Sequence, residues 1–289
     1  MNRETAVFSS TGSTGQALHA AAREARCAVI CGVPGMGKSL LLREQARIAT
    51  DLGRPVHRLQ WDIARQPFER GDILARYPEI EGSTHPVIRR AAGIWVRRAV
   101  AQWWSTHEDG ADLLLIEAPL VGARFIELAR QGSDAAEACL ASPTTRFLVP
   151  VPSREVRAAI QAARVSDTAA PQHERDTASA IPVLVDVLWQ EVVAAARALE
   201  LAEGDHRPDN QHEYSPALYA ALFHQVLRHR HNAVVPVTEI VAAPGSPHAH
   251  TQASHELAPQ DSEVSALIAA AEAEGVTEVL RASEAWHLL

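Results

Sequence analysis

The feature that most constrains the fold of this chain is a run of eight residues, GVPGMGKS, from Gly32 to Ser39. It fits the pattern G-x-x-x-x-G-K-[ST] at every fixed position. The five apolar residues before it, Cys27 to Cys31, predict a short buried strand. Leu40 to Thr50 after it predict a helix, with Gly53 just past its end as a C-cap. The sequence therefore predicts a strand, a tight glycine loop and a helix in direct succession.

Such a loop is suited to binding phosphate. Its glycines let backbone N–H groups curl round an anion, and the N-terminus of the following helix adds partial positive charge. Lys38 is the only lysine among 289 residues, whereas arginine supplies the other 26 basic side chains. A compact ammonium fits between the β- and γ-phosphates of a nucleotide, where the wide guanidinium fork of arginine would crowd the loop. We expect nucleotide contacts from all nine residues of this stretch: Gly32, Val33, Pro34, Gly35, Met36, Gly37, Lys38, Ser39 and Leu40.

The bulk composition excludes several classes of protein. From residue 242 onward there are seven acidic residues and one arginine, so most of the net charge of −8 lies there and the body is close to neutral. No basic run favours nucleic acid, and no apolar stretch could span a bilayer or serve as a signal peptide. Three cysteines make no disulfide framework. We expect a cytoplasmic protein with no membrane or nucleic-acid partner; homo-oligomerisation stays open.

Apolar runs alternate with helical patterns along the chain. Strands are expected at 27–31, 54–62, 112–119, 145–152 and 232–240, with helices at 86–107, 123–141, 181–201, 215–231 and 261–273. This alternation predicts a three-layer αβα sandwich around a mostly parallel, five-stranded sheet. We divide the chain into a lead-in helix (1–26), a main domain (27–241), a linker (242–260) and an acidic helical extension (261–289).

With this order of elements, the chain resembles the nucleoside and nucleotide kinases of the P-loop NTPase superfamily over roughly residues 27–240. The resemblance implies Mg²⁺ and ATP or GTP as ligands. It places Glu117, at the end of the third strand, with Ser39 at the metal. Asp62, which ends the second strand, takes the position of the acid that contacts the phosphoryl acceptor, and Arg65 and Arg124 resemble anion-binding arginines. Trp61 could stack on an acceptor ring.

Kinases of this group carry an arginine-bearing lid after the fourth strand, and the stretch 153–180 resembles it. Arg154, Arg157 and Arg164 are spaced three and seven residues apart, which puts them on one helical face. Mobile arginines can stabilise the charge that spreads over the transferred phosphoryl group. An amphipathic surface helix with solvated arginines would have the same pattern.

We therefore expect an ATP-dependent phosphotransferase acting on a small hydroxyl- or phosphate-bearing acceptor. Lys38, Asp62, Arg154, Arg157 and Arg164 would be its catalytic residues. Two alternatives stay open: a regulatory ATPase that works through a protein partner, and a kinase for polynucleotide ends. The Asp-Arg-[Ser/Tyr] triplet usual after the third strand of deoxynucleoside kinases is absent, so the sequence does not identify the acceptor.

Overall fold

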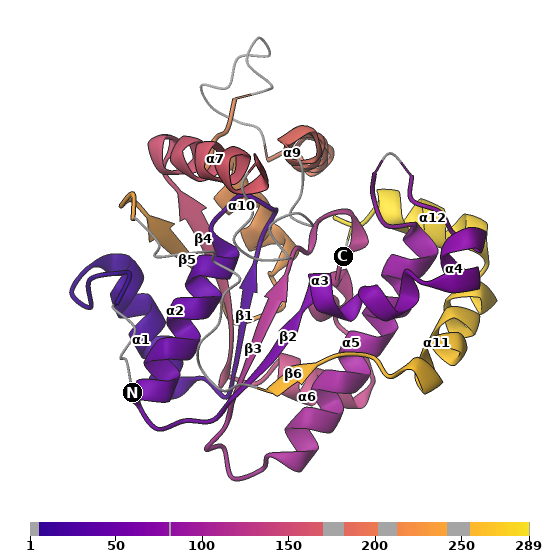
Figure 1. The fold of residues 1–289 in the computed structure, drawn as a ribbon, viewed down its shortest axis with the longest axis horizontal. Coiled ribbons are helices and arrows are strands. Elements are labelled where there is room, and N and C mark those ends of the chain that lie inside the picture. The colour runs from indigo at the N-terminus through magenta and orange to yellow at the C-terminus, as the bar shows by residue number, and fades with distance from the viewer. Residues whose placement is uncertain (1–5, 81, 170–181, 202–212, 242–254, 289) are drawn as a thin grey trace.

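The computed structural model of this chain describes residues 6–80, 82–169, 182–201, 213–241 and 255–288. Its described strands form one sheet in the order β5-β4-β1-β3-β2-β6, and every neighbouring pair is parallel (Figure 1). Parallel strands need crossover connections, which the helices between them supply. The strands are β1 (Cys27–Cys31), β2 (Val56–Gln60), β3 (Leu113–Ala118), β4 (Thr145–Pro152), β5 (Asn232–Val237) and β6 (His255–Leu257).

Both faces of the sheet are buried under helices. In β1, Cys27, Val29 and Cys31 belong to one apolar core, and Ala28 and Ile30 to a second. This alternation follows from the two-residue period of a strand. On the side of the second core lie α1 (Ser13–Glu24), α2 (Lys38–Asp51) and α7 (Arg154–Ala169). The first core is covered by α5 (Pro86–Thr106), α6 (Ala135–Leu140), α9 (Pro182–Ala198) and α10 (Pro216–Val226) (Figure 1).

The predicted α/β fold with a parallel sheet is confirmed, but the expected number of strands is wrong. The sheet has a sixth strand, β6, which lies within residues 242–260, a range predicted to be a linker. His255, Glu256 and Leu257 pair in register with His57, Arg58 and Leu59 of β2. Three residues carry too little hydrophobic pattern to be recognised as a strand from sequence, and an edge position needs only one partner. Residues 242–254 lie outside the described part.

The helix predicted for residues 123–141 is also wrong. The chain there forms two 3₁₀ turns, η2 (Val121–Ala123) and η3 (Ile126–Leu128), and then the short α6. Ala123 and Phe125 have positive φ, 62° and 63°, which an α-helix does not allow. Arg97 on α5 donates to the carbonyls of Glu127 and Arg130 at 2.7 and 3.0 Å. Distant arginine side chains therefore satisfy carbonyls that a helix would have bonded internally.

The acidic C-terminal segment packs against the body. It consists of α11 (Asp261–Ala273) and α12 (Val276–Glu284), and both contact α5 (Figure 1). Arg90 on α5 pairs with Glu274 at 2.7 Å, and the Tyr77 hydroxyl donates to Glu272 at 2.6 Å. Val264, Leu267 and other apolar residues of α11 join the larger core. The short helices are α3 (Trp61–Ala64), η1 (Gln66–Phe68) and α4 (Gly71–Arg76).

Among the helices that the structure describes, we find none that combines the length and the apolar character needed to cross a membrane.

Candidate functional site

The glycine-rich loop, Gly32–Ser39, joins β1 to α2 as the sequence predicts. Gly32, Gly35 and Gly37 have φ values of 139°, 86° and 80°, a region that side chains with a Cβ adopt only under strain. Gly37 is also the N-cap of α2, and no side chain among the described residues caps this helix. Its first backbone N–H groups and its positive dipole end are therefore directed at the space above the loop, which suits an anion.

Gly32 has a second reason to be glycine. A Cβ built there would lie 2.0 Å from the hydroxyl oxygen of Tyr219, a fully buried residue of α10. The first turn of the loop is therefore packed tightly against α10. Any larger residue at position 32 would have to displace a buried aromatic ring.

The single lysine is folded across this loop. Its ammonium group donates to the carbonyl of Val33 at 3.2 Å and lies 3.8 Å from Oε1 of Glu117. Lys38 is only 6 % exposed. An ammonium in this position bridges the loop backbone and the end of β3, so a phosphate group entering the loop would meet it directly.

Glu117 lies beside the loop because β3 is the neighbour of β1, where Glu117 pairs in register with Ile30. Its Oε1 accepts a hydrogen bond from the Ser39 hydroxyl at 3.0 Å, and its Oε2 accepts one from the Gln60 amide at 3.1 Å. A carboxylate and a hydroxyl at this separation are the oxygen ligands that Mg²⁺ takes in nucleotide sites. The residues thus fit a magnesium ion, and Gln60 holds the carboxylate in place.

The other apolar positions of the loop have structural roles. Val33 and Met36 are fully buried in the larger core, and Pro34 and Leu40 are half-buried. They anchor the loop so that its glycines and Lys38 keep their conformation.

The prediction that Asp62 ends the second strand is wrong, because β2 ends at Gln60 and Asp62 lies on α3. This helix follows the carboxyl end of β2, so Asp62 lies at the same end of the sheet as the loop. Its side chain is 57 % exposed, and Arg65 donates to it at 3.3 Å and also pairs with Glu69. Although burial lowers the pKa of Arg65, the two carboxylates hold that pKa above its ordinary value. Asp62 is therefore an accessible carboxylate oriented by a fixed cation, whereas the neighbouring Trp61 is buried edge-to-face against Phe125 at 5.1 Å.

Arg124 is next to a second arginine that the sequence did not indicate. Arg124 and Arg89 are 5 % and 8 % exposed, and both approach Gly122. Burial, together with the positive charge of the neighbouring Arg124, lowers the pKa of Arg89 to about 9. Burial also lowers the pKa of Arg124, and Arg65 contributes. Two guanidinium groups that disfavour each other's charge form a place where an anion would be stabilised.

Glu191 on α9 places a carboxylate beside this pair. A Cβ on Gly122 would lie 2.5 Å from Nη1 of Arg124 and 2.6 Å from Oε2 of Glu191, so these atoms converge. Within the described residues, Oε2 of Glu191 is buried without a hydrogen-bond partner. Oε2 of Glu191 therefore lies beside the two guanidinium groups without a hydrogen bond among the described residues.

The arginines expected in a lid differ from one another. Arg154 is exposed and pairs with Glu213 at 3.0 Å. Arg157 is 5 % exposed and lies over the rings of Tyr214 and Trp189, at 4.5 and 5.0 Å from their centroids, and burial lowers its pKa. Arg164 belongs to α7, but its side chain lies outside the described part, as do residues 170–181 of the predicted lid.

Helix α7 nevertheless lies over the loop. A Cβ on Gly37 would contact Ile160 of α7 at 3.5 Å. The structure thus brings Lys38, Ser39 and Glu117 together, with α7 above them and the Asp62 and Arg124 groups beyond the ends of β2 and β3. The sequence missed Gln60, Arg89 and Glu191. The position of Gln60, directly before Trp61 and Asp62, was the only signal for any of them.

In comparisons with known proteins, no family model, no curated protein and no solved structure matches this chain.

Proposed function

We propose that this protein is an ATP-dependent phosphotransferase that passes the γ-phosphoryl group of Mg·ATP to a small-molecule acceptor. One observation supports this most strongly: the only lysine, a loop hydroxyl and a strand-end carboxylate meet at an uncapped helix N-terminus. Lys38 and Ser39 come from the loop, and Glu117 comes from a strand 78 residues further on. The combination is typical of P-loop kinases, the class that the sequence resembles.

On the donor side, the backbone N–H groups of the loop would bind phosphate oxygens, and Lys38 would neutralise charge on the β- and γ-phosphates. The Ser39 hydroxyl and Glu117 would hold the magnesium ion, which, when bound, screens the phosphate charge and orients the transferred group. GTP would fit the same phosphate contacts, since none of these residues touches a base.

On the acceptor side, Asp62 would accept the proton of the attacking hydroxyl or orient it, because its carboxylate is accessible and fixed by Arg65. Arg65, Arg89 and Arg124 favour an acceptor that carries an anionic group, such as a nucleotide or another phosphorylated metabolite. Arg154 of α7, which is exposed, would close over the transferred group, and Arg157 would act from its buried position beside Tyr214 and Trp189. In such a reaction, rate enhancement comes mainly from positioning and charge stabilisation.

The test follows labelled phosphate. The purified protein is incubated with Mg²⁺, ATP labelled at the γ-phosphate and a fractionated metabolite extract, and the label is traced to small molecules, water or polynucleotides. We expect label in a small acceptor, and Asp62→Asn to abolish its appearance. The matched control is Asp72→Asn, another exposed aspartate, which should transfer normally. Release of label only to water, stimulated by a protein partner, would indicate a regulatory ATPase, and label on polynucleotide ends an end kinase; either result overturns the proposal.

A further inference from the structure

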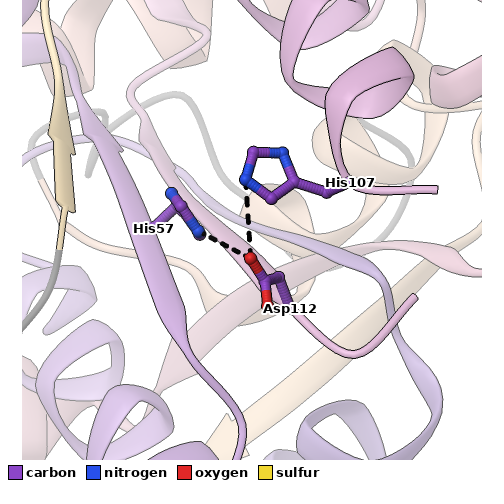
Figure 2. A group of neighbouring side chains, drawn as sticks. All are labelled: His57, His107 and Asp112. Atoms are coloured by element: carbon purple, nitrogen blue, oxygen red, sulfur yellow. Dashed lines mark hydrogen bonds and ion pairs between the residues drawn. The ribbon is translucent and has the colours of Figure 1, made fainter. Parts of the chain in front are cut away.

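A second cluster of polar side chains lies at the opposite end of the sheet, where the strands begin. His57 is near the start of β2, Asp112 immediately precedes β3, and His107 follows the end of α5. Because the strands are parallel, the amino ends of all strands lie at one end of the sheet. The loop and Glu117 lie at the other end, where the strands finish. Figure 2 shows both imidazole rings directed at the carboxylate of Asp112. This cluster takes no part in the proposed phosphotransfer.

The distances within the cluster match those of a metal site. Nε2 of His57 is 2.9 Å and Nε2 of His107 is 3.5 Å from the same oxygen, Oδ2 of Asp112 (Figure 2). One ligand atom from each residue lies within 4.8 Å of the other two. Zinc binds imidazole nitrogen and carboxylate oxygen at about 2.0–2.2 Å, so tetrahedral geometry separates two ligand atoms by about 3.3 Å. The observed spacings lie on either side of this value.

One ring nitrogen of His107 is held by the backbone. Its Nδ1 lies 2.8 Å from the carbonyl oxygen of Trp103, which can only accept, so Nδ1 carries a proton. Its Nε2 faces Oδ2 of Asp112 at 3.5 Å. A backbone carbonyl on the other ring nitrogen is the usual support of a metal-binding histidine.

His57 is the most deeply buried member of the cluster. His255 of β6 stacks on it with ring centroids 5.1 Å apart. His57 is 9 % exposed, while the His107 and Asp112 side chains are 24 % and 18 % exposed. His57 is therefore fixed by its buried surroundings, whereas the side chains of His107 and Asp112 are accessible to an ion from solvent.

The backbone around the cluster is fixed by two arginines. Arg54 donates to the carbonyl of Asp112 at 2.8 Å and to that of Ala111 at 3.0 Å. Arg26 donates to the carbonyls of Trp104 and His107, each at 2.6 Å. The ring of Trp103 stacks on His107 with centroids 4.7 Å apart. The three side chains therefore come from rigid, well-supported positions, which a metal site requires.

We propose that His57, His107 and Asp112 form a binding site for a divalent transition-metal ion, zinc in particular. Nε2 of each histidine and a carboxylate oxygen of Asp112 would be the ligands, and the remaining position would face solvent. On binding, the proton that His57 shares with Asp112 moves to Nδ1, which frees Nε2 for the metal. Imidazole ligands favour zinc over magnesium, so the site is distinct from the Ser39–Glu117 pair. The ion ties β2, β3 and the end of α5 together.

The test measures Zn²⁺ binding to the metal-free, full-length protein by calorimetry at pH 7.5, with Co²⁺ absorption as a spectroscopic readout of tetrahedral nitrogen and oxygen ligation. We expect one tight equivalent of Zn²⁺ and a rise in the melting temperature. His107→Gln and Asp112→Asn should each weaken this binding about 100-fold, in line with the loss of a metal ligand. His224→Gln, which removes an exposed histidine of α10, and Glu117→Gln should leave it unchanged.

The Asp112→Asn variant keeps a hydrogen-bond acceptor for His57 and should therefore fold. It provides the test if His107→Gln fails to fold. Equal Zn²⁺ affinity in the wild-type protein and in folded Asp112→Asn would overturn the proposal, as would a tight site that His224→Gln or Glu117→Gln removes. Absence of any tight equivalent in the wild-type protein would also overturn it. None of these outcomes depends on ATP, so this proposal can fail while the phosphotransferase proposal stands.

Discussion

Replacing Glu117 by glutamine should change ATP affinity in opposite directions with and without magnesium. Glutamine has the same shape as glutamate but no charge. In the structure Glu117 has two roles at the loop: it offers oxygen ligands beside the Ser39 hydroxyl, and it partly neutralises Lys38 from 3.8 Å. The first role supports Mg·ATP. The second role weakens the binding of magnesium-free ATP, because the carboxylate of Glu117 repels the phosphates and competes with them for the ammonium group of Lys38.

The magnitude follows from the same distance. Two unit charges 3.8 Å apart interact by about 4 kcal/mol at an effective dielectric constant of about 20, which is an upper bound. If about 1 kcal/mol of this reaches the binding equilibrium, Glu117→Gln should bind magnesium-free ATP about five-fold more tightly. In the presence of Mg²⁺ the variant should bind at least about ten-fold more weakly than the wild-type protein, because a charged metal ligand is lost.

The assay is calorimetric titration with ATP in EDTA and in excess Mg²⁺, on protein whose thermal unfolding shows that it is folded. Ser39→Ala provides the contrast, since it removes the hydroxyl ligand without altering charge. It should weaken Mg·ATP binding and leave magnesium-free binding unchanged. If Glu117→Gln weakens both forms alike, or if magnesium improves its ATP affinity as much as in the wild-type protein, Glu117 only caps the loop and the assignment of the metal site is wrong.

Three further outcomes are expected. Lys38→Arg should lower kcat/KM for phosphoryl transfer at least about 100-fold although charge is conserved, because the guanidinium does not fit the loop; near-normal turnover would contradict the steric explanation. Asp62→Asn should abolish transfer while ATP affinity, measured by calorimetry, stays within a few-fold; parallel loss of both would place Asp62 in donor binding or in the fold. Hydrogen bonds from Arg230 and Arg97 lower the pKa of Glu137 to about 2, so its stabilising effect is complete above pH 4.5 and disappears as the pH falls toward 2. The stability difference between the wild-type protein and Glu137→Gln in urea should therefore be about 1–2 kcal/mol at pH 6, discounted because the carboxylate is partly exposed, and should shrink through that window; a pH-independent difference would refute this reading.

The sequence determined the elements whose signal is local. The strand Cys27–Cys31, the glycine loop and the following helix were all readable, because each depends on side-chain periodicity and on backbone conformations that only glycine adopts easily. The end of β3 at Glu117 was readable for the same reason. From that order the parallel α/β fold followed, since parallel strands need helical crossovers.

Only the tertiary structure decided what lies side by side. The sheet order sets β3 against β1 and so brings Glu117 to Ser39, and it gathers Arg89, Arg124 and Glu191 from three separate elements. The histidine cluster was invisible in the sequence because its members are 50 and 5 residues apart, with no metal-binding spacing. The backbone of residues 123–141 could not be predicted for the same reason. The local sequence favours a helix there, but side chains of Arg97 and Arg230 donate hydrogen bonds to its carbonyls instead. These arginines reach the carbonyls only once the chain has folded.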